Sequence, residues 1–371
     1  MPRPLFVAFS DAHLDVHAWA DRPAIAGDSQ HAFEQICDYA IEHQLPMVAA
    51  GDLIDRRINS AAPIGFLRRQ LDRLRDAQIP FFFIQGQHEL QPTPWLSEIH
   101  EWPIWLHDVY ANIGGRVVYG LDWQPHDKVA NCLDRVPEDC DALVLHQVCH
   151  EFMGSIAPAE ISLVQVPWAS LVVVGDYHVH RRISLAGKQG QSLSVLSPGS
   201  THLRAINEES VKRFFVVYDD LSAQSVPLQT RPLIDRLVLS DDDLDDLVAT
   251  IRDEILADTG PSESPVRKPI VRVRYSPDLR DPYRRICEAV GNTGHLFASV
   301  YADEKEGEWE EGDETFDEVS QLGLVGCLPA LLPEEQDPQL FSFVRSLLEQ
   351  DHLPVLAEWR ARFLGEVDET A

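Results

Sequence analysis

Residues 4–13 read PLFVAFSDAH, an apolar run followed at once by Asp11 and His13. A run this short suits a strand buried on both faces better than a helix. We therefore predict a strand at Pro4–Phe9 that delivers a carboxylate and an imidazole at its carboxyl end. The run is too short for a secretory signal, and no stretch approaches a membrane span, so we expect a cytoplasmic protein without membrane contact.

The same pattern recurs four times along the chain. Short apolar runs end at Asp52, at Gly86-Gln87-His88-Glu89, at His146 and at Gly175-Asp176-Tyr177-His178. Stretches with helical spacing, at residues 30–43 and 64–78, alternate with the first three runs. This alternation predicts an α/β domain, and ligands of such sheets bind at the carboxyl ends of the strands. Five strand ends carrying Asp, His or an amide are hard to obtain by chance.

The donor types of this cluster indicate its chemistry. Carboxylates, imidazoles and one amide suit Mn²⁺, Mg²⁺, Fe or Zn²⁺, and no cysteine follows these runs. The set is larger than one ion needs. It suits two metal ions that share a carboxylate, an arrangement that activates water for in-line displacement at phosphorus.

The order Asp-x-His, Gly-Asp-x-x-Asp, Gly-Asn-His-Asp/Glu, His, Gly-His-x-His is typical of calcineurin-like metallophosphoesterases. About the first 220 residues of the chain resemble that family. The chain is most similar to the SbcD-type DNA repair exonuclease subunit, including phage relatives, because of Leu14, the strand end Gly120-Leu121-Asp122-Trp123 and a following βαβ-like unit. The resemblance implies an α/β fold in which a β-sandwich is flanked by helices, with a small α+β capping domain and C-terminal helices.

The resemblance also implies the ligands of two divalent metal ions. Asp52 would bridge them. The first ion would also bind Asp11, His13 and His178, and the second would also bind Gln87, His146 and Asp176.

Other residues would act on the substrate. By the same resemblance, His88 would protonate or stabilise the leaving oxygen, and Asp55 would orient His88. Arg56 has a guanidinium that can bind a phosphate at two points, although a surface helix start explains it equally well. His180, followed by two arginines, is a second candidate for phosphate contact.

Two positions depart from the family pattern. Gln87 stands where the family has Asn, and Asp176 stands where it has the first His of Gly-His-x-His. Both changes affect ligands of the second metal. That site becomes richer in oxygen donors and favours Mn²⁺ or Mg²⁺ over Zn²⁺. The two changes could equally weaken the binding of the second metal. In an alternative register, His178-Val179-His180 is the metal-binding pair and Asp176 is a turn residue.

The chain changes character near Leu233. We expect a metallophosphoesterase domain at residues 1–230 and a capping βαβ-like domain at residues 231–303. The acidic residues 304–335 are typical of a linker. We expect residues 336–371 to form helices that dock a partner. The chain has 31 Lys and Arg against 60 Asp and Glu, a net charge of -29, which opposes DNA binding by this chain alone.

Three functions fit these residues. The resemblance favours a metal-dependent DNA exonuclease or endonuclease, homodimeric and paired with an SbcC-like coiled-coil ATPase, in repair, replication or defence. The second is a phosphatase or phosphodiesterase acting on nucleotides, small phosphoesters or phosphoproteins. The third is a scaffold or DNA-end-binding subunit whose second metal has been weakened by Gln87 and Asp176.

Overall fold

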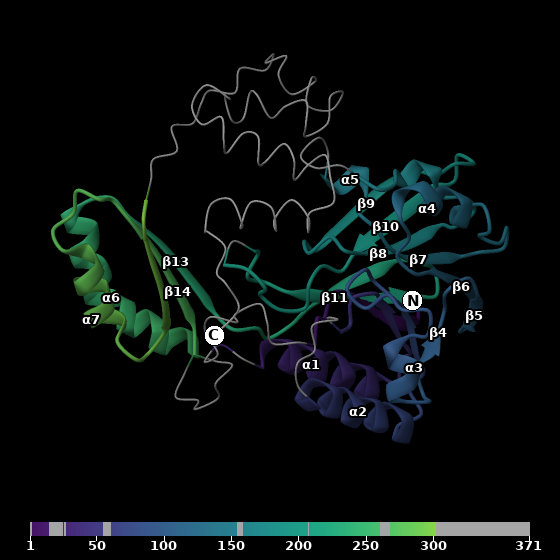
Figure 1. Ribbon diagram of the computed structural model, residues 1–371, viewed down its shortest axis with the longest axis horizontal. Coiled ribbons are helices and arrows are strands. Elements are labelled where there is room, and N and C mark those ends of the chain that lie inside the picture. Colours follow the sequence, from purple (N-terminus) through teal and green to yellow (C-terminus); the bar gives the residue numbers. More distant parts are fainter. Residues whose placement is uncertain are drawn as a thin grey trace, which may run out of the picture. The chain divides into compact units, whose positions relative to one another are not determined.

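Two six-stranded sheets form most of the β-structure in the described part of the computed structural model (Figure 1). The structure describes residues 2–14, 25, 27–54, 61–153, 159–206, 208–259 and 268–301. The first sheet contains β1 (Pro4–Phe9), β2 (Met47–Ala50), β3 (Phe81–Ile84), β4 (Ile104–Trp105), β11 (Arg213–Tyr218) and β12 (Ala223–Pro227). The second contains β5 (Tyr110–Ile113), β6 (Arg116–Leu121), β7 (Ala142–His146), β8 (Leu171–Gly175), β9 (Arg181–Ala186) and β10 (Ser192–Ser197).

The order of strands places the polar strand ends side by side. The first sheet runs β12-β11-β1-β2-β3-β4, with β1, β2 and β3 parallel. The second runs β5-β6-β7-β8-β10-β9, with β6, β7 and β8 parallel. Parallel neighbours end at the same edge, so the residues that follow β1, β2 and β3 share one edge, as do those that end β7 and β8.

The two sheets pack face to face through small and branched side chains. Phe6, Ala8 and Val48 of the first sheet share one buried cluster with Val144 and Val173 of the second. The central strands are buried on both faces, which explains why they appear in the sequence as unbroken apolar runs. This sandwich brings the carboxyl ends of β1, β2 and β3 next to those of β7 and β8.

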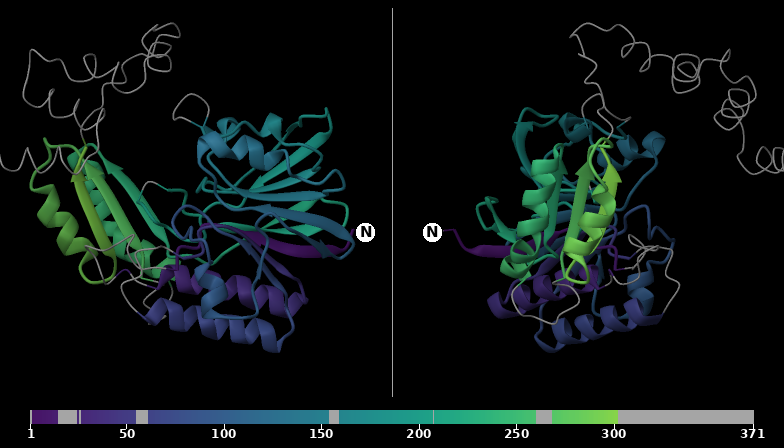
Figure 2. Two further views of the ribbon diagram at one scale, coloured as in Figure 1. Left: turned by 45° about the vertical axis from the view of Figure 1, so that its right-hand side comes forward. Right: turned by 90° about the vertical axis from the view of Figure 1, so that its left-hand side faces the viewer.

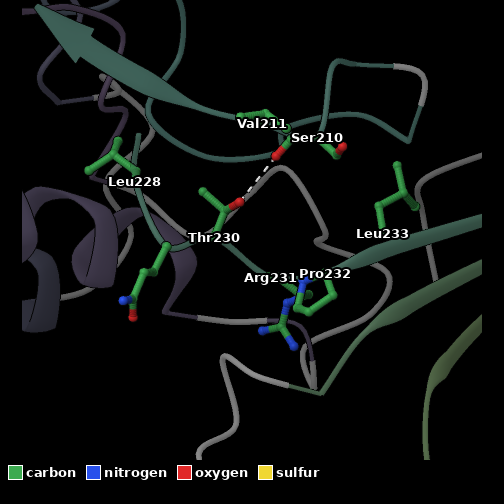
Figure 3. A pocket seen from close by; sticks show the side chains of 8 residues that line it. Ser210, Val211, Leu228, Thr230, Arg231, Pro232 and Leu233 are labelled. Carbon is green, nitrogen blue, oxygen red and sulfur yellow. Dashed lines mark hydrogen bonds between the residues drawn. The ribbon is translucent and has the colours of Figure 1, made fainter. Parts of the chain in front are cut away.

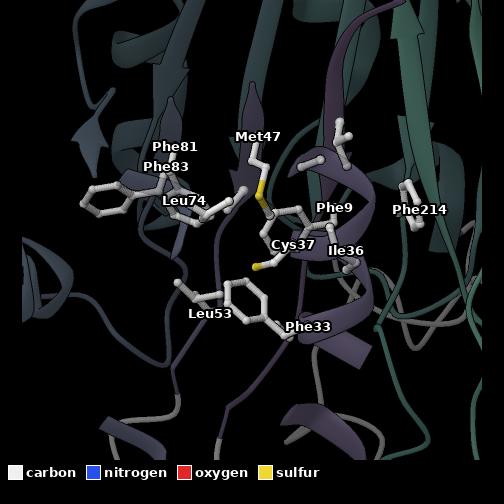
Figure 4. Packing of buried hydrophobic residues seen from close by; sticks show 14 of the residues in the cluster. Phe9, Phe33, Ile36, Cys37, Met47, Leu53, Leu74, Phe81, Phe83 and Phe214 are labelled. Carbon is white, nitrogen blue, oxygen red and sulfur yellow. The ribbon is translucent and has the colours of Figure 1, made fainter. Parts of the chain in front are cut away.

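Helices cover the outer faces of both sheets. On the first sheet lie α1 (Asp28–His43) and α2 (Ala61–Asp76), which share a core with it (Figures 2 and 4). Phe33 of α1 packs on Phe9 of β1 with ring centroids 5.8 Å apart. On the second sheet lie α4 (His126–Leu133) and α5 (His150–Met153), and the short α3 (Trp95–Ile99) follows β3.

A third sheet follows, made of β13 (Leu233–Val238), β14 (Ile270–Tyr275) and β15 (His295–Val300). All three strands are parallel. The helices α6 (Asp241–Thr259) and α7 (Pro282–Val290) share a core with one face of this sheet (Figure 2). The strand–helix–strand order expected here is present, and β13 adds a strand that the sequence did not reveal. The domain boundaries at residues 230 and 303 stay predictions.

The predicted α/β class with a helix-flanked sandwich is confirmed. The strands that sequence analysis missed are mostly half-exposed edge strands, such as β9, in which apolar residues are too few to mark a strand. The predicted linker at residues 304–335 and the helices at residues 336–371 lie outside the described residues. Within the described part, no helix has the length and apolarity needed to cross a membrane.

Candidate metal centre

The sandwich gathers eight of the predicted site residues at one edge. Asp11 and His13 follow β1, Asp52 follows β2, and Gln87 and His88 follow β3. From the second sheet, His146 is the last residue of β7, and Asp176 and His178 follow β8. Three overlapping sets of these side chains bring ligand atoms within 4.8 Å of one another: Asp11, His13 and His178; His13, Asp52 and His88; Asp11, Asp52 and His146.

Asp52 lies at the centre of the cluster. Its Oδ2 is 3.6 Å from His13 Nε2, 3.5 Å from His146 Nε2 and 3.9 Å from His88 Nε2. Its Oδ1 accepts a hydrogen bond from the backbone N–H of His88, at 3.1 Å. One carboxylate oxygen that faces three imidazoles on different strands is the geometry that a bridging ligand requires.

Asp11 organises the side of the cluster that holds His13 and His178. Asp11 Oδ1 is 3.8 Å from His13 Nε2 and 3.6 Å from His178 Nε2. Asp11 also accepts the backbone N–H of Asp176 at 3.2 Å, which ties the end of β8 to the end of β1. All three side chains converge on the space that the predicted first metal needs.

The two unusual donors, Gln87 and Asp176, contact each other. Gln87 Nε2 donates to Asp176 Oδ1 at 2.6 Å, and the same oxygen lies 3.9 Å from His146 Nε2. The longer amide arm and the shorter carboxylate arm therefore meet on the side of Asp52 that holds His146. Their contact satisfies part of the hydrogen-bonding capacity that a second metal would use.

His178 belongs to the cluster, whereas His180 belongs to the scaffold. His180 Nδ1 is 3.0 Å from Pro198 O, and its Nε2 is 2.8 Å from Ser225 Oγ. Its ring stacks on Phe215 with centroids 4.2 Å apart. Both ring nitrogens thus have protein partners, and the predicted contact of His180 with substrate stays a prediction.

The backbone at the strand ends is held in costly conformations. Asp11, His13, Asp52 and Asp176 have φ of 51°, 38°, 50° and 81°, which are four of the ten positive φ values at non-glycine residues in the described ranges. Side chains disfavour this region, and such residues concentrate at functional sites. The tight turns aim these side chains at one point instead of letting them alternate across the sheet.

Close packing behind the cluster requires glycine at two positions. A Cβ on Gly86 would lie 2.1 Å from Asp52 Oδ1, and one on Gly51, where φ is 86°, would lie 2.3 Å from His146 Nδ1. No other side chain fits these spaces. Gly51 and Gly86 therefore leave the space that the side chains of His146 and Asp52 occupy.

The electrostatics of the cluster fit a bound cation. Burial opposes protonation of His146, yet the carboxylates of Asp52, Asp11 and Asp176 raise its pKa well above the ordinary value. Burial would raise the pKa of Asp52, but His146 and His13 lower it. His13 is kept neutral, because burial lowers its pKa.

Among the residues that the structure describes, Asp52 Oδ2 and His146 Nε2, two buried ligand atoms of the cluster, have no hydrogen-bond partner. Buried polar atoms are almost always satisfied, and metal coordination would satisfy these two. Oxygen and imidazole donors with a surplus of carboxylate charge suit divalent cations, so the residues present fit the predicted metals.

A second layer of charged residues was missed by sequence analysis. Glu208 Oε1 lies 3.3 Å from His178 Nδ1, and Lys212 Nζ donates to Glu208 Oε2 at 2.8 Å. Arg204 places a guanidinium nitrogen 2.7 Å from His13 Nε2. The signal available in the sequence is the spacing Arg204-x₃-Glu208-x₃-Lys212, which begins four residues after Ser200.

Of the predicted substrate-acting residues His88, Asp55 and Arg56, the structure describes His88. His88 stays partly open, with 37% of its side chain exposed, and faces Asp52. Asp55 and Arg56 lie outside the described residues, so their predicted roles stay predictions.

A cavity of about 530 Å³ lies elsewhere, between Ser210–Val211 and Leu228–Leu233 (Figure 3). It contains Arg231, which is buried and paired with Asp28 at 2.6 Å. Thr230 Oγ1 donates to Ser210 O at 3.1 Å. Because Asp28 already neutralises the charge of Arg231, this cavity is a weaker candidate site than the cluster around Asp52.

Comparisons with known proteins support a metal-dependent phosphoesterase. No protein-family model matches the chain. The DNA double-strand break repair protein Mre11 of Methanosarcina acetivorans is 28% identical over 215 residues, which are 54% of this chain and 34% of the relative. Mre11 of Haloferax volcanii is 30% identical over 236 residues, which are 60% of this chain and 52% of the relative. The uncharacterised metallophosphoesterase YhaO of Bacillus subtilis is 27% identical over 239 residues, 57% of each chain.

Over about half of its length, the chain is similar to Mre11 proteins and to a metallophosphoesterase, which supports the calcineurin-like metallophosphoesterase superfamily. It spans between about a third and just over half of the length of these relatives. A solved archaeal phosphodiesterase aligns with 60% of the chain at 10% identity and a TM-score of 0.33, which is too low to add to this conclusion. The similarity to this superfamily therefore rests on the curated relatives, and the described sheets and ligand cluster are compatible with it.

Proposed function

We propose that the protein is a metal-dependent nuclease that hydrolyses phosphodiester bonds of DNA. One observation carries the proposal: Asp52 Oδ2 lies 3.5–3.9 Å from the Nε2 atoms of His146, His13 and His88. A shared carboxylate among imidazoles is what a two-metal phosphoesterase needs. DNA is proposed as substrate because the Mre11 relatives are named as DNA double-strand break repair proteins.

Each residue has a proposed task. Asp11, His13 and His178 hold a first divalent cation, and Asp52 bridges it to a second. The second is also held by Gln87, His146 and Asp176, and Mn²⁺ fits this oxygen-rich set best among Mn²⁺, Mg²⁺, Fe and Zn²⁺. When bound, the two cations supply Lewis acidity that makes water a nucleophile at neutral pH.

His88 handles the leaving group. Hydrolysis breaks a P–O bond, and the departing oxygen needs a proton. The partly exposed His88 imidazole, 3.9 Å from Asp52, is placed to donate it. Asp55 is proposed to orient His88, and Arg56 to bind the phosphate.

The register with Asp176 and His178 as ligands is the one we propose. It is supported by the 3.6 Å approach of His178 Nε2 to Asp11 and by the contacts that hold His180 against Pro198 and Ser225.

The proposal includes a partner protein that binds DNA. With a net charge of -29, this chain repels DNA, so an SbcC-like coiled-coil ATPase docked on residues 336–371 would supply the basic surface. The nuclease chain would work as a homodimer in repair, replication or defence. Removal of residues 336–371 should abolish copurification with such an ATPase and leave hydrolysis of a small phosphodiester intact.

The activity is tested with purified protein, Mn²⁺ and linear DNA, alongside nucleotides and a phosphopeptide. Asp52→Asn and His88→Gln should each abolish DNA hydrolysis, whereas His43→Gln, on the exposed side of α1, should not. DNA hydrolysis that survives both site substitutions would refute the proposal. Preference for nucleotides or phosphopeptide over DNA would instead indicate a phosphatase or a small-substrate phosphodiesterase.

A further inference from the structure

Arg204 reaches into the ligand cluster from outside the predicted set. Its guanidinium nitrogen is 2.7 Å from His13 Nε2 and 3.5 Å from His178 Nε2. Both imidazole nitrogens also face Asp11 Oδ1, at 3.8 Å and 3.6 Å. The guanidinium therefore contacts the nitrogen atoms that the proposed first metal would use.

The guanidinium and a metal ion compete for His13. A neutral imidazole has one lone pair, which either accepts an N–H or binds a metal. A guanidinium only donates hydrogen bonds, so the Nε2 of His13 offers that lone pair to Arg204, 2.7 Å away. Arginine cannot lose its proton in a protein. A cation bound to His13 must therefore displace the guanidinium, and the two positive charges then repel each other.

An anion between the two cations reverses this repulsion. A phosphoryl group has several oxygens, and a guanidinium binds two of them in one plane. Once displaced from His13, the side chain of Arg204 would have a phosphoryl group as an alternative partner for its N–H groups.

The backbone around Arg204 is fixed while the side chain makes this exchange. The backbone N–H of Arg204 donates to Glu208 Oε2 at 3.1 Å. The same carboxylate oxygen accepts Lys212 Nζ at 2.8 Å and Ser200 Oγ at 3.3 Å. A fixed backbone with a long side chain suits a residue that alternates between two partners.

We propose that Arg204 is a substrate-binding residue that couples the loading of the first metal to the binding of phosphate. Without phosphate, Arg204 competes with the metal for His13. With phosphate present, Arg204 and the metal hold the same anion, so each strengthens the binding of the other. This inference rests on the proposed function and adds a ligand of the phosphoryl group to it.

Mn²⁺ titration by calorimetry tests the coupling, with inorganic phosphate as the probe anion. Wild type, Arg204→Gln, Arg204→Lys and the control Arg68→Gln, exposed on α2, are each titrated with and without phosphate. Without phosphate, Arg204→Gln should bind Mn²⁺ about tenfold more tightly than wild type, because the competitor is gone. The gain in Mn²⁺ affinity caused by phosphate should be at least about fivefold larger in wild type than in Arg204→Gln.

The other variants complete the test. Arg204→Lys keeps a positive charge and should lie between wild type and Arg204→Gln, whereas Arg68→Gln should match wild type. Weaker Mn²⁺ binding by a folded Arg204→Gln would overturn the inference, since it would mean that Arg204 merely braces His13. An unchanged phosphate effect would overturn it too. Absence of Mn²⁺ binding by wild type would overturn both this inference and the proposed nuclease.

Discussion

The Nδ1 atom of His178 lies 3.3 Å from a carboxylate oxygen of Glu208. Although burial opposes it, this contact and the charge of Asp11 raise the pKa of His178. A carboxylate on Nδ1 holds a proton there and fixes the ring so that Nε2 faces the ligand cluster. Glu208 thus orients His178 in the way that carboxylates behind metal-bound histidines commonly do.

Substitution of Glu208 should weaken metal binding. Glu208→Gln removes the charge that fixes the His178 ring, and loss of such a partner typically costs about 10- to 100-fold in metal affinity. The neighbouring Glu209→Gln, which changes an exposed carboxylate, provides the matched control. The Mn²⁺ dissociation constant measured by calorimetry checks this. Equal affinity in both variants would show that Glu208 does not orient His178.

The pair of Glu208 and Lys212 should contribute to stability as a unit. Lys212 has only 3% of its side chain exposed and lies 2.8 Å from Glu208. Glu208→Gln leaves the buried ammonium unpaired, which typically costs about 3–5 kcal/mol. Adding Lys212→Met removes that charge, so the double variant should be more stable than Glu208→Gln alone. Denaturant unfolding without metal measures this, and strict additivity of the two changes would contradict it.

The sequence predicted the site residues on strand ends better than those on loops. Asp11, Asp52 and His146 follow apolar runs, and a strand end fixes the position of a side chain in the fold. Arg204 and Glu208 lie in a loop without periodicity, and their positions depend on long-range contacts with β1 and β8 that the sequence does not encode locally. Edge strands such as β9 were missed for a related reason, because half-exposed strands carry little apolar signal.

Gln87 and Asp176 should act as a coupled pair. Their 2.6 Å hydrogen bond means that changing one alters the environment of the other. Asp176→His alone removes the acceptor of Gln87, and Gln87→Asn alone is too short to keep the bond. Each single change should lower the amount of second metal bound, whereas the double change creates the family pattern and should restore it with greater tolerance for Zn²⁺.

Elemental analysis after loading with Mn²⁺ or Zn²⁺ measures the outcome for these variants. A matched Gln78→Asn change, remote from the site on the chain after α2, controls for the loss of a methylene. Equal metal content in both single variants and the double variant would refute the coupling.

His202 should make the protein sensitive to acid. Burial, with added repulsion from Arg204 and Lys212, lowers the pKa of its imidazole to about 3. The unfolded chain takes up this proton near pH 6.5, so between pH 6.5 and 3 only the unfolded state is protonated at His202. The stability contribution of neutral His202 is complete above pH 6.5. It falls by about 1.4 kcal/mol for each pH unit below that value.

His202→Leu removes the titrating group together with a buried Nδ1 for which the described part of the chain offers no hydrogen-bond partner. Between pH 7 and pH 5, its free energy of unfolding should therefore fall by about 2 kcal/mol less than that of wild type. Chelator-treated samples keep metal binding out of the comparison, and His43→Gln on the exposed side of α1 should behave as wild type. Because wild type and His202→Leu share every other titrating group, the difference between their two slopes isolates His202. Identical slopes for wild type and His202→Leu would mean that the folded protein accommodates the imidazolium at this position.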